Sequence, residues 1–194
     1  MDYREKSLRE LAARRGYQFA AADEFHLQRQ LQGFRLSTRG RARQITNVLR
    51  RQHGLLEHDA YIFDYRYEDF GHESTVRQTV LYLHSQQLGL PEVLLQPETL
   101  LHKLGELFGL HDIDFVRFPK FSKQYRLTGE DEEYIRHQFS DDVLNYFTLN
   151  KGWSLEGLGY YLLLYKKGVL LPPDQIDALY QRGMEVFGLF SVAE

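Results

Sequence analysis

The chain has 194 residues, no cysteine and a formal net charge of −3 at pH 7. This length suffices for one domain with its own core, and the lack of cysteine excludes both a disulfide framework and thiolate chemistry. No segment approaches the ~18 consecutive apolar residues that a membrane-spanning helix requires, and the charged residues 1–15 do not resemble a signal peptide. We therefore expect a cytoplasmic protein.

The segment 1–33 is expected to contain two short helices. Apolar residues recur at helical spacing within residues 8–12, and Gly16 stands where a left-handed C-cap belongs. Asp23 can cap a second helix, which Gly33 would end. Both helices carry few apolar residues, so we expect them at the edge of the core.

Residues 34–86 are expected to form an antiparallel meander of four strands, which would begin with Phe34 and Leu36. The clearest strand spans 61–68, where aromatic residues alternate with mostly charged ones. One side carries Tyr61, Phe63, Tyr65 and Tyr67, and the other carries Ile62, Asp64, Arg66 and Glu68. Such alternation is typical of a strand with one packed and one wetter face, and the short connections favour antiparallel pairing.

Helices are predicted again within 97–149, followed by a hairpin at 153–167 and a C-terminal helix at 172–190. Pro97 suits the first turn of a helix that Gly109 would close. Strands and helices come in blocks and do not alternate, which favours α+β over α/β. The sequence thus predicts a single α+β domain over residues 1–194. We expect an antiparallel meander sheet plus a later hairpin, with helices packed on one face.

Several motifs together resemble an uncharacterised family of bacterial proteins, some members of which follow membrane-anchoring segments. They are FDY-x-Y at 63–67, LPEVLLQPE at 90–98, DIDF at 112–115, FSKQYRLTGEDEEYIR at 121–136 and WSLEG at 153–157. The resemblance covers nearly the whole chain. It implies no catalytic residue, only a domain often found near membranes. This chain has no span of its own, which argues against membrane attachment here.

His111, Asp112 and Asp114 form the densest local set of candidate metal ligands. A hard-cation loop would need more oxygen ligands than these two carboxylates supply, and zinc or iron sites need histidine pairs that the chain lacks. We favour the alternative that the two aspartates shape the loop after Gly109. No metal and no cofactor are therefore expected.

Asp64 and Glu156 are the weak candidates for catalysis. A carboxyl among aromatic side chains can have its pKa raised by desolvation and can then act as an acid or base. Nothing in the sequence shows that the two approach each other. The commoner arrangement, which we favour, pairs Asp64 with an arginine of a neighbouring strand.

The charge is distributed unevenly, because residues 25–56 contain seven arginines and no acid. The seven are Arg29, Arg35, Arg39, Arg41, Arg43, Arg50 and Arg51. One interpretation is an anion-binding patch, carried by the four near hairpin ends, which are Arg39, Arg41, Arg50 and Arg51. The interpretation that we favour pairs these arginines with acids of the following strand, where each exposed pair contributes about 0–1 kcal/mol.

No assembled catalytic constellation is visible, so we expect a non-enzymatic binding or protein-interaction module. Its first expected partner is a protein, including a second copy of the chain. A membrane surface is the alternative partner, and nucleic acid is not expected. Two further hypotheses stay open. One is an anion- or membrane-surface-binding module that uses the arginine-rich hairpin, and the other is an enzyme of unrecognised type that uses Asp64 or Glu156.

Overall fold

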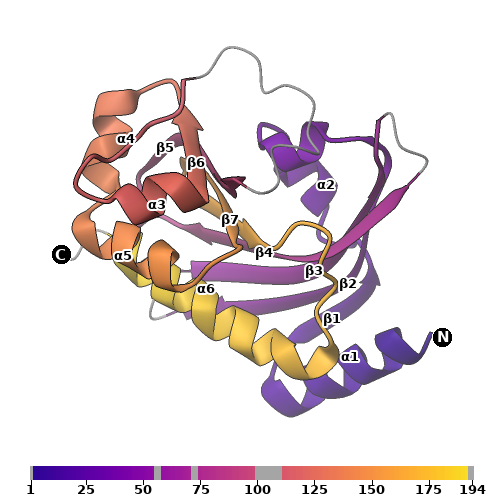
Figure 1. The fold of residues 1–194 in the computed structure, drawn as a ribbon. Coiled ribbons are helices and arrows are strands. Elements are labelled where there is room, and N and C mark those ends of the chain that lie inside the picture. Colours follow the sequence, from indigo (N-terminus) through magenta and orange to yellow (C-terminus); the bar gives the residue numbers. More distant parts are fainter. Residues whose placement is uncertain (1, 55–57, 71–73, 99–110, 192–194) are drawn as a thin grey trace.

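The structure is a computed structural model that describes residues 2–54, 58–70, 74–98 and 111–191. Its centre is one eight-stranded antiparallel sheet with the strand order β1-β2-β3-β4-β8-β7-β5-β6 (Figure 1). The strands are β1 (Gln18–Ala22), β2 (Arg41–His53), β3 (His58–Glu68), β4 (Thr75–Ser85), β5 (Leu90–Pro97), β6 (Tyr125–Gly129), β7 (Ser154–Gly159) and β8 (Tyr161–Tyr165). A single α+β domain with an antiparallel sheet is thereby confirmed.

Helices cover both faces of this sheet. The α-helices are α1 (Tyr3–Arg15), α2 (Leu27–Gln30), α3 (Pro119–Gln124), α4 (Glu132–Gln138), α5 (Asp141–Leu149) and α6 (Ile176–Phe190). Within the described residues, η1 (Arg35–Thr38) and η4 (Pro173–Gln175) are 3-10 helices. The expectation that the helices pack on one face holds only for α1 and α3–α6, which share the face that we call the helical face. The short elements α2 and η1 pack on the opposite face, which we call the aromatic face (Figure 1).

The aromatic face is the dry side that the alternation in β3 predicts. Phe63, Tyr65 and Tyr67 are buried there together with aromatic residues of β4 and β8. Burial raises the pKa of Tyr65 to about 12, because a phenolate would have to lose its hydration in this environment. The leucines and phenylalanine of the segment from α2 to η1 fill the hollow of this face, so it forms a second core.

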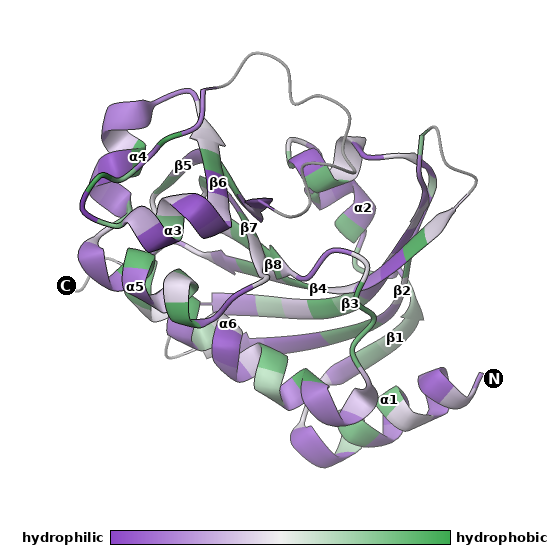
Figure 2. Ribbon diagram, in the orientation of Figure 1, coloured by the Kyte–Doolittle hydropathy of each residue, from purple (hydrophilic) through white to green (hydrophobic). Residues whose placement is uncertain are grey.

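The other side of β3 is less wet than the sequence suggests. Ile62 and Asp64 are buried, and only Arg66 is exposed. The physical reason is that α1 and α6 lie across this side (Figure 1). Along α6, hydrophobic and hydrophilic residues alternate in the way that a helix with one buried side requires (Figure 2).

The prediction that the meander begins with a strand at Phe34 and Leu36 is wrong. Phe34 is the N-cap of η1 and Leu36 lies within it, and both side chains are buried in the aromatic core. The meander therefore consists of β2, β3 and β4, and its outer neighbour is β1, which falls in the segment that was expected to be helical.

The hairpin expected at 153–167 is formed by β7 and β8, and β8 pairs with β4. Pro97 is the last residue of β5, where it lies opposite Tyr125. The rest of the helix expected up to Gly109 lies outside the described residues. None of the described helices is both long and apolar enough to cross a bilayer.

Candidate functional site

Glu156 lies on β7, on the aromatic face, in a cross-strand row with Leu94 and Leu163. It is 2% exposed. The Tyr165 hydroxyl donates to Oε1 at 2.7 Å, and the Leu36 amide donates to both carboxyl oxygens at 3.1 and 3.2 Å. The carboxyl therefore ties η1 to the centre of the sheet.

Burial raises the pKa of the Glu156 carboxyl, because the charged form is poorly solvated there. The positive charge of Arg39 opposes this shift, as do the hydrogen bonds that the carboxyl accepts. Arg39 itself donates to the Gln96 Oε1 atom at 3.2 Å. The surroundings of Glu156 are thus a buried polar cluster within an otherwise apolar core.

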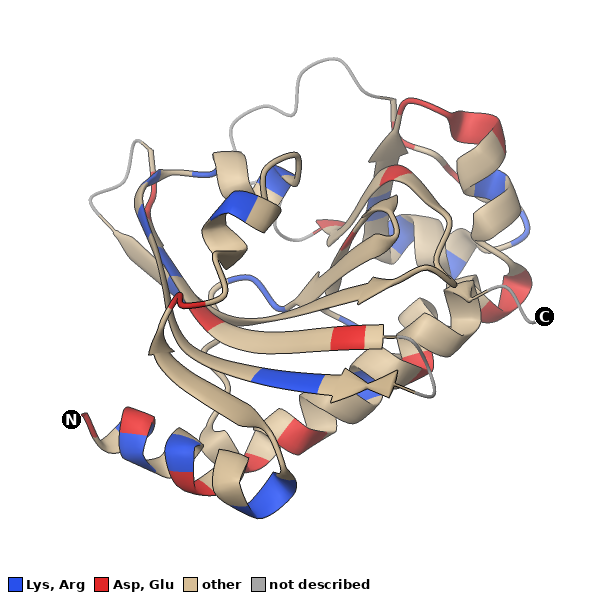
Figure 3. Cartoon of the chain, turned by 180° about the vertical axis from the view of Figure 1, so that it is seen from behind, with Lys and Arg blue, Asp and Glu red and all other residues tan. Residues whose placement is uncertain are grey.

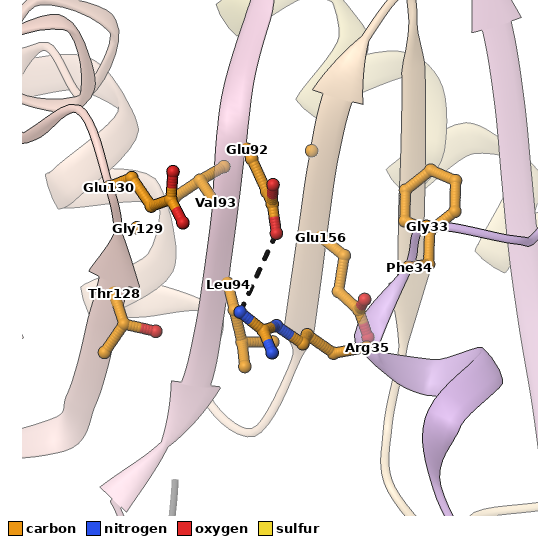
Figure 4. Close-up of a pocket in the computed structure, with 11 residues that line it drawn as sticks. Gly33, Phe34, Arg35, Glu92, Val93, Leu94, Thr128, Gly129, Glu130 and Glu156 are labelled. Carbon is orange, nitrogen blue, oxygen red and sulfur yellow. Dashed lines mark ion pairs between the residues drawn. The ribbon is translucent and has the colours of Figure 1, made fainter. Parts of the chain in front are cut away.

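A cavity beside Glu156 has a volume of about 10 Å³, which is room for about one water molecule (Figure 4). Thr128 lines it from β6, and its buried Oγ1 makes no hydrogen bond within the described chain. At the rim, Arg35 and Glu92 form an ion pair at 3.7 Å (Figure 4). The space is too small for a substrate to reach the carboxyl.

Asp64 lies on the helical face and does not pair with an arginine of a neighbouring strand. Its partner is Arg4 of α1, which donates to both carboxylate oxygens at 2.7 Å. Asn47 adds a third hydrogen bond at 2.9 Å from a bulge of β2, where its φ of 52° lies in the left-handed region. Since Asp64 and Glu156 face opposite sides of the sheet, they cannot act as an acid–base pair.

The four arginines proposed as an anion site do not converge. Arg39 points into the aromatic core. Arg41 pairs with Glu68 at 3.2 Å and lies at the other end of β2 from the remaining two. Arg50 and Arg51 are neighbours that point to opposite faces. Arg50 pairs with Asp59 at 2.7 Å, and Arg51 stacks on Tyr17 and Tyr180. Two of the four thus pair with acids of β3, as in the interpretation that we favoured.

The loop 111–114 protects an edge of the sheet. The Asp112 Oδ1 atom accepts the Leu127 amide at 3.0 Å, and the Ile113 amide donates to the Leu127 carbonyl at 2.8 Å. These bonds satisfy backbone groups of β6 that no strand reaches. In the part of the chain that the structure describes, no group of three or more histidines and carboxylates could hold a metal ion.

A groove with a volume of about 540 Å³ opens between the loop 114–118 and helices α4 and α5. We call it the 114–118 groove. Its lining includes Phe115, Val116, Arg117, Phe118, Phe139 and Leu144. Phe139 and Leu144 are buried and form the floor, whereas Val116 is 95% exposed. Of the three candidate metal ligands His111, Asp112 and Asp114, only Asp114 lines the groove, and the groove itself is not predicted from the sequence.

Hydrogen bonds with two helices hold the loop in place. Arg136 of α4 donates to the Asp114 carbonyl at 2.8 Å, and its guanidinium lies 5.1 Å from the centre of the Phe115 ring. The Phe115 amide donates to the Ser122 hydroxyl at 2.9 Å. The exposed Val116 is therefore presented by a fixed backbone.

Comparison with known proteins adds no assignment to this geometry. The chain matches no family model, no curated protein and no solved structure. The resemblance to a bacterial family drawn from its motifs stays a prediction. Function is therefore inferred from the geometry alone.

Proposed function

We propose that this chain is a non-enzymatic protein-binding module that holds an extended segment of a partner protein in the 114–118 groove. One observation carries the proposal: a groove of about 540 Å³ has an aromatic and aliphatic floor and a rim residue, Val116, that is 95% exposed. Its volume is in the range of about 300–1,000 Å³ that is typical of ligand sites.

The chemistry of the groove indicates what it would hold. An apolar or aromatic side chain that covers Val116 and reaches the floor removes apolar surface from water, and a fully buried valine contributes about 1.5–3 kcal/mol. The side chain of Arg117 is 83% exposed and lies 3.7 Å from Asp141. It is therefore accessible to a carboxylate of the partner. The expected ligand is an apolar residue next to an acidic one.

The fixed backbone of the loop favours binding for a second reason. Loops that become ordered on binding lose conformational entropy, which weakens affinity. Here Arg136 and Ser122 already hold the loop in its position.

The two competing hypotheses have less support. An enzyme that uses Glu156 would need a substrate to reach a cavity the size of about one water molecule. An anion site would need Arg39, Arg41, Arg50 and Arg51 to converge, and they point in different directions. The groove needs no rearrangement.

Selection from a displayed library of random peptides tests the proposal. We expect peptides with an apolar residue beside an acidic one to be enriched on the purified protein. Val116→Asp should lower the affinity for the enriched peptides at least about tenfold, because it places a charge at the apolar rim. A tenfold loss corresponds to about 1.4 kcal/mol. The matched control is Leu149→Asp, since Leu149 is 81% exposed on α5 but does not line the groove.

Two results would contradict the proposal. One is that no peptide is enriched. The other is that enriched peptides bind Val116→Asp as tightly as they bind the unaltered chain. Circular dichroism of both variants checks that the fold is intact.

A further inference from the structure

The sheet has two edge strands, β6 and β1, and they differ in whether their outward backbone groups are hydrogen-bonded. On β6, the Asp112 carboxylate and the Ile113 amide occupy the outward backbone groups of Leu127. This is one of the devices by which proteins block unwanted strand pairing. The opposite edge is β1.

No loop among the described residues bonds the outer edge of β1 in the way that the loop 111–114 bonds β6. Within the described residues, the strand pairs with β2 alone, and its one other backbone bond is a local turn in which the Ala22 carbonyl accepts from Glu24. Its sequence QFAAA contains no charge and no proline (Figure 3). Gln18 and Ala22 are exposed. An uncharged, open edge of this kind is a template for another strand.

The face of β1 is covered, so pairing is available at the edge only. Phe19 packs on the helical face, where the Arg9 guanidinium of α1 lies 4.8 Å from the centre of its ring. Ala20 is buried on the aromatic face. An added strand would therefore extend the sheet and would not displace a helix.

The charges that flank β1 favour a second copy of the chain in antiparallel orientation. If two copies pair about Ala20, Gln18 of one copy faces Ala22 of the other, so the residues before β1 in one copy lie near the residues after β1 in the other. The basic end of α1, which is blue in Figure 3 and carries the exposed Arg14, then approaches the exposed Glu24 of the other copy. Parallel pairing would bring like charges together. The same patch on both subunits makes a closed two-fold dimer.

We infer that β1 pairs with β1 of a second copy of this chain, antiparallel and centred on Ala20, so that the two sheets join. A five-residue strand gives an interface of only about 17 Å in length. Small interfaces form weak and transient complexes, so the dimer depends on concentration. The proposal is independent of the 114–118 groove.

Engineered disulfides test the register. The chain has no cysteine, so introduced cysteines can form disulfides only with one another. In Gln18→Cys/Ala22→Cys, the thiol at position 18 of each copy faces the thiol at position 22 of the other. Opposite Cα atoms of antiparallel strands lie about 4.5–5.5 Å apart, within disulfide range. Within one copy the two sites are about 13 Å apart, which is too far. Mild oxidation should give a covalent dimer.

The control for random collision is Tyr3→Cys, because Tyr3 is exposed on α1 and lies outside the strand. We expect it to cross-link much more slowly than the strand pair. Equal cross-linking of the two variants would contradict the register.

Sedimentation velocity tests the dimer without cysteine. The unaltered chain should shift from monomer to dimer with concentration, and Ala21→Lys should weaken this association at least tenfold, because a lysine on the edge repels strand pairing. Val116→Asp should leave it unchanged, which separates this inference from the proposed function. A chain that stays monomeric at the highest soluble concentration would overturn the inference. If Ala21→Lys fails to fold, the disulfide result decides.

Discussion

At the scale of single residues, two buried carboxylates hold segments that strand pairing does not reach. Glu156 fixes η1 on the aromatic face through Leu36, and Asp64 fixes α1 on the helical face through Arg4. Each joins parts of the chain far apart in sequence. Their chemistry is that of structural anchors, and we expect substitutions to change stability.

The substitution Glu156→Gln should change how the free energy of unfolding depends on pH. The pKa of Glu156 is raised above its ordinary value of 4.5, so the folded state binds the proton more tightly than the unfolded state does. That contribution is complete below the unfolded pKa and is lost as pH rises through the folded pKa. The glutamine variant, which does not titrate, lacks this loss.

We therefore expect Glu156→Gln to be the less stable protein by about 2 kcal/mol near pH 4.5, because its amide nitrogen cannot accept the hydrogen bonds that the carboxyl accepts. The difference should shrink between pH 4.5 and pH 8. Urea unfolding at several pH values measures it. A difference that stays constant over this range would show that the carboxyl has no raised pKa.

Arg4 and Asp64 should be energetically coupled. Arg4→Met leaves the Asp64 carboxylate with fewer partners in a largely buried place, and we expect it to lower the free energy of unfolding by about 2 kcal/mol. The double variant Arg4→Met/Asp64→Leu should lose less than the sum of the single changes. Urea unfolding of the four proteins completes the cycle, and strict additivity would show that the pair is not coupled.

At the scale of elements, the segment from α2 to η1 fills the hollow of the sheet. Leu27 and Leu36 are fully buried there, although the elements that carry them are only four residues long. Elements this short depend on capping and tertiary contacts for their stability. Asp23 supplies a cap, because its carboxylate accepts the amides of Leu27 and Gln28 at 2.7 and 2.9 Å.

Asp23→Ala should therefore lower the free energy of unfolding by about 1 kcal/mol, as the loss of a side chain that accepts the first amides of a helix usually does. Asp23→Asn should retain most of the stability, because its side-chain oxygen still accepts one amide. Thermal and urea unfolding measure both variants. Equal losses in the two would indicate that the charge of Asp23 matters and its cap does not.

How much of the fold could be predicted varies from element to element. The strand at 61–68 was clear because its strict alternation extends over eight residues, and the cap at Asp23 is a local signal. Phe34 and Leu36 do not form the predicted strand, because two apolar residues at this spacing fit a strand and a turn equally well. The sequence does not predict β1, because this strand has only five residues and three of them are alanine, which is uncommon in strands.

The candidate site was predictable only in part, for a related reason. The sequence singles out Asp64 and Glu156 as carboxylates among apolar neighbours, but their partners lie 60 and 120 residues away. Such partners follow from tertiary packing and leave no periodic pattern. The 114–118 groove needs α4, α5 and a loop to meet, so its existence is not visible in any one segment.

At the scale of the whole molecule, helices and short turns cover both faces of the sheet, and the two surfaces we assign to binding lie outside these cores. The 114–118 groove lies beside α4 and α5, near the β6 side of the sheet, while the β1 edge lies at its opposite end (Figure 1). A partner segment and a second copy could then bind at the same time.

Hydrogen exchange at backbone amides tests the central claim most directly. An enriched peptide is added to the protein, and exchange is compared with and without it. We expect slower exchange in the loop 114–118 and in the first turn of α5, with β1 unaffected and with no slowing in Val116→Asp. Slower exchange at β1 or around Glu156, without any change in the loop, would contradict the assignment of this groove as the binding site.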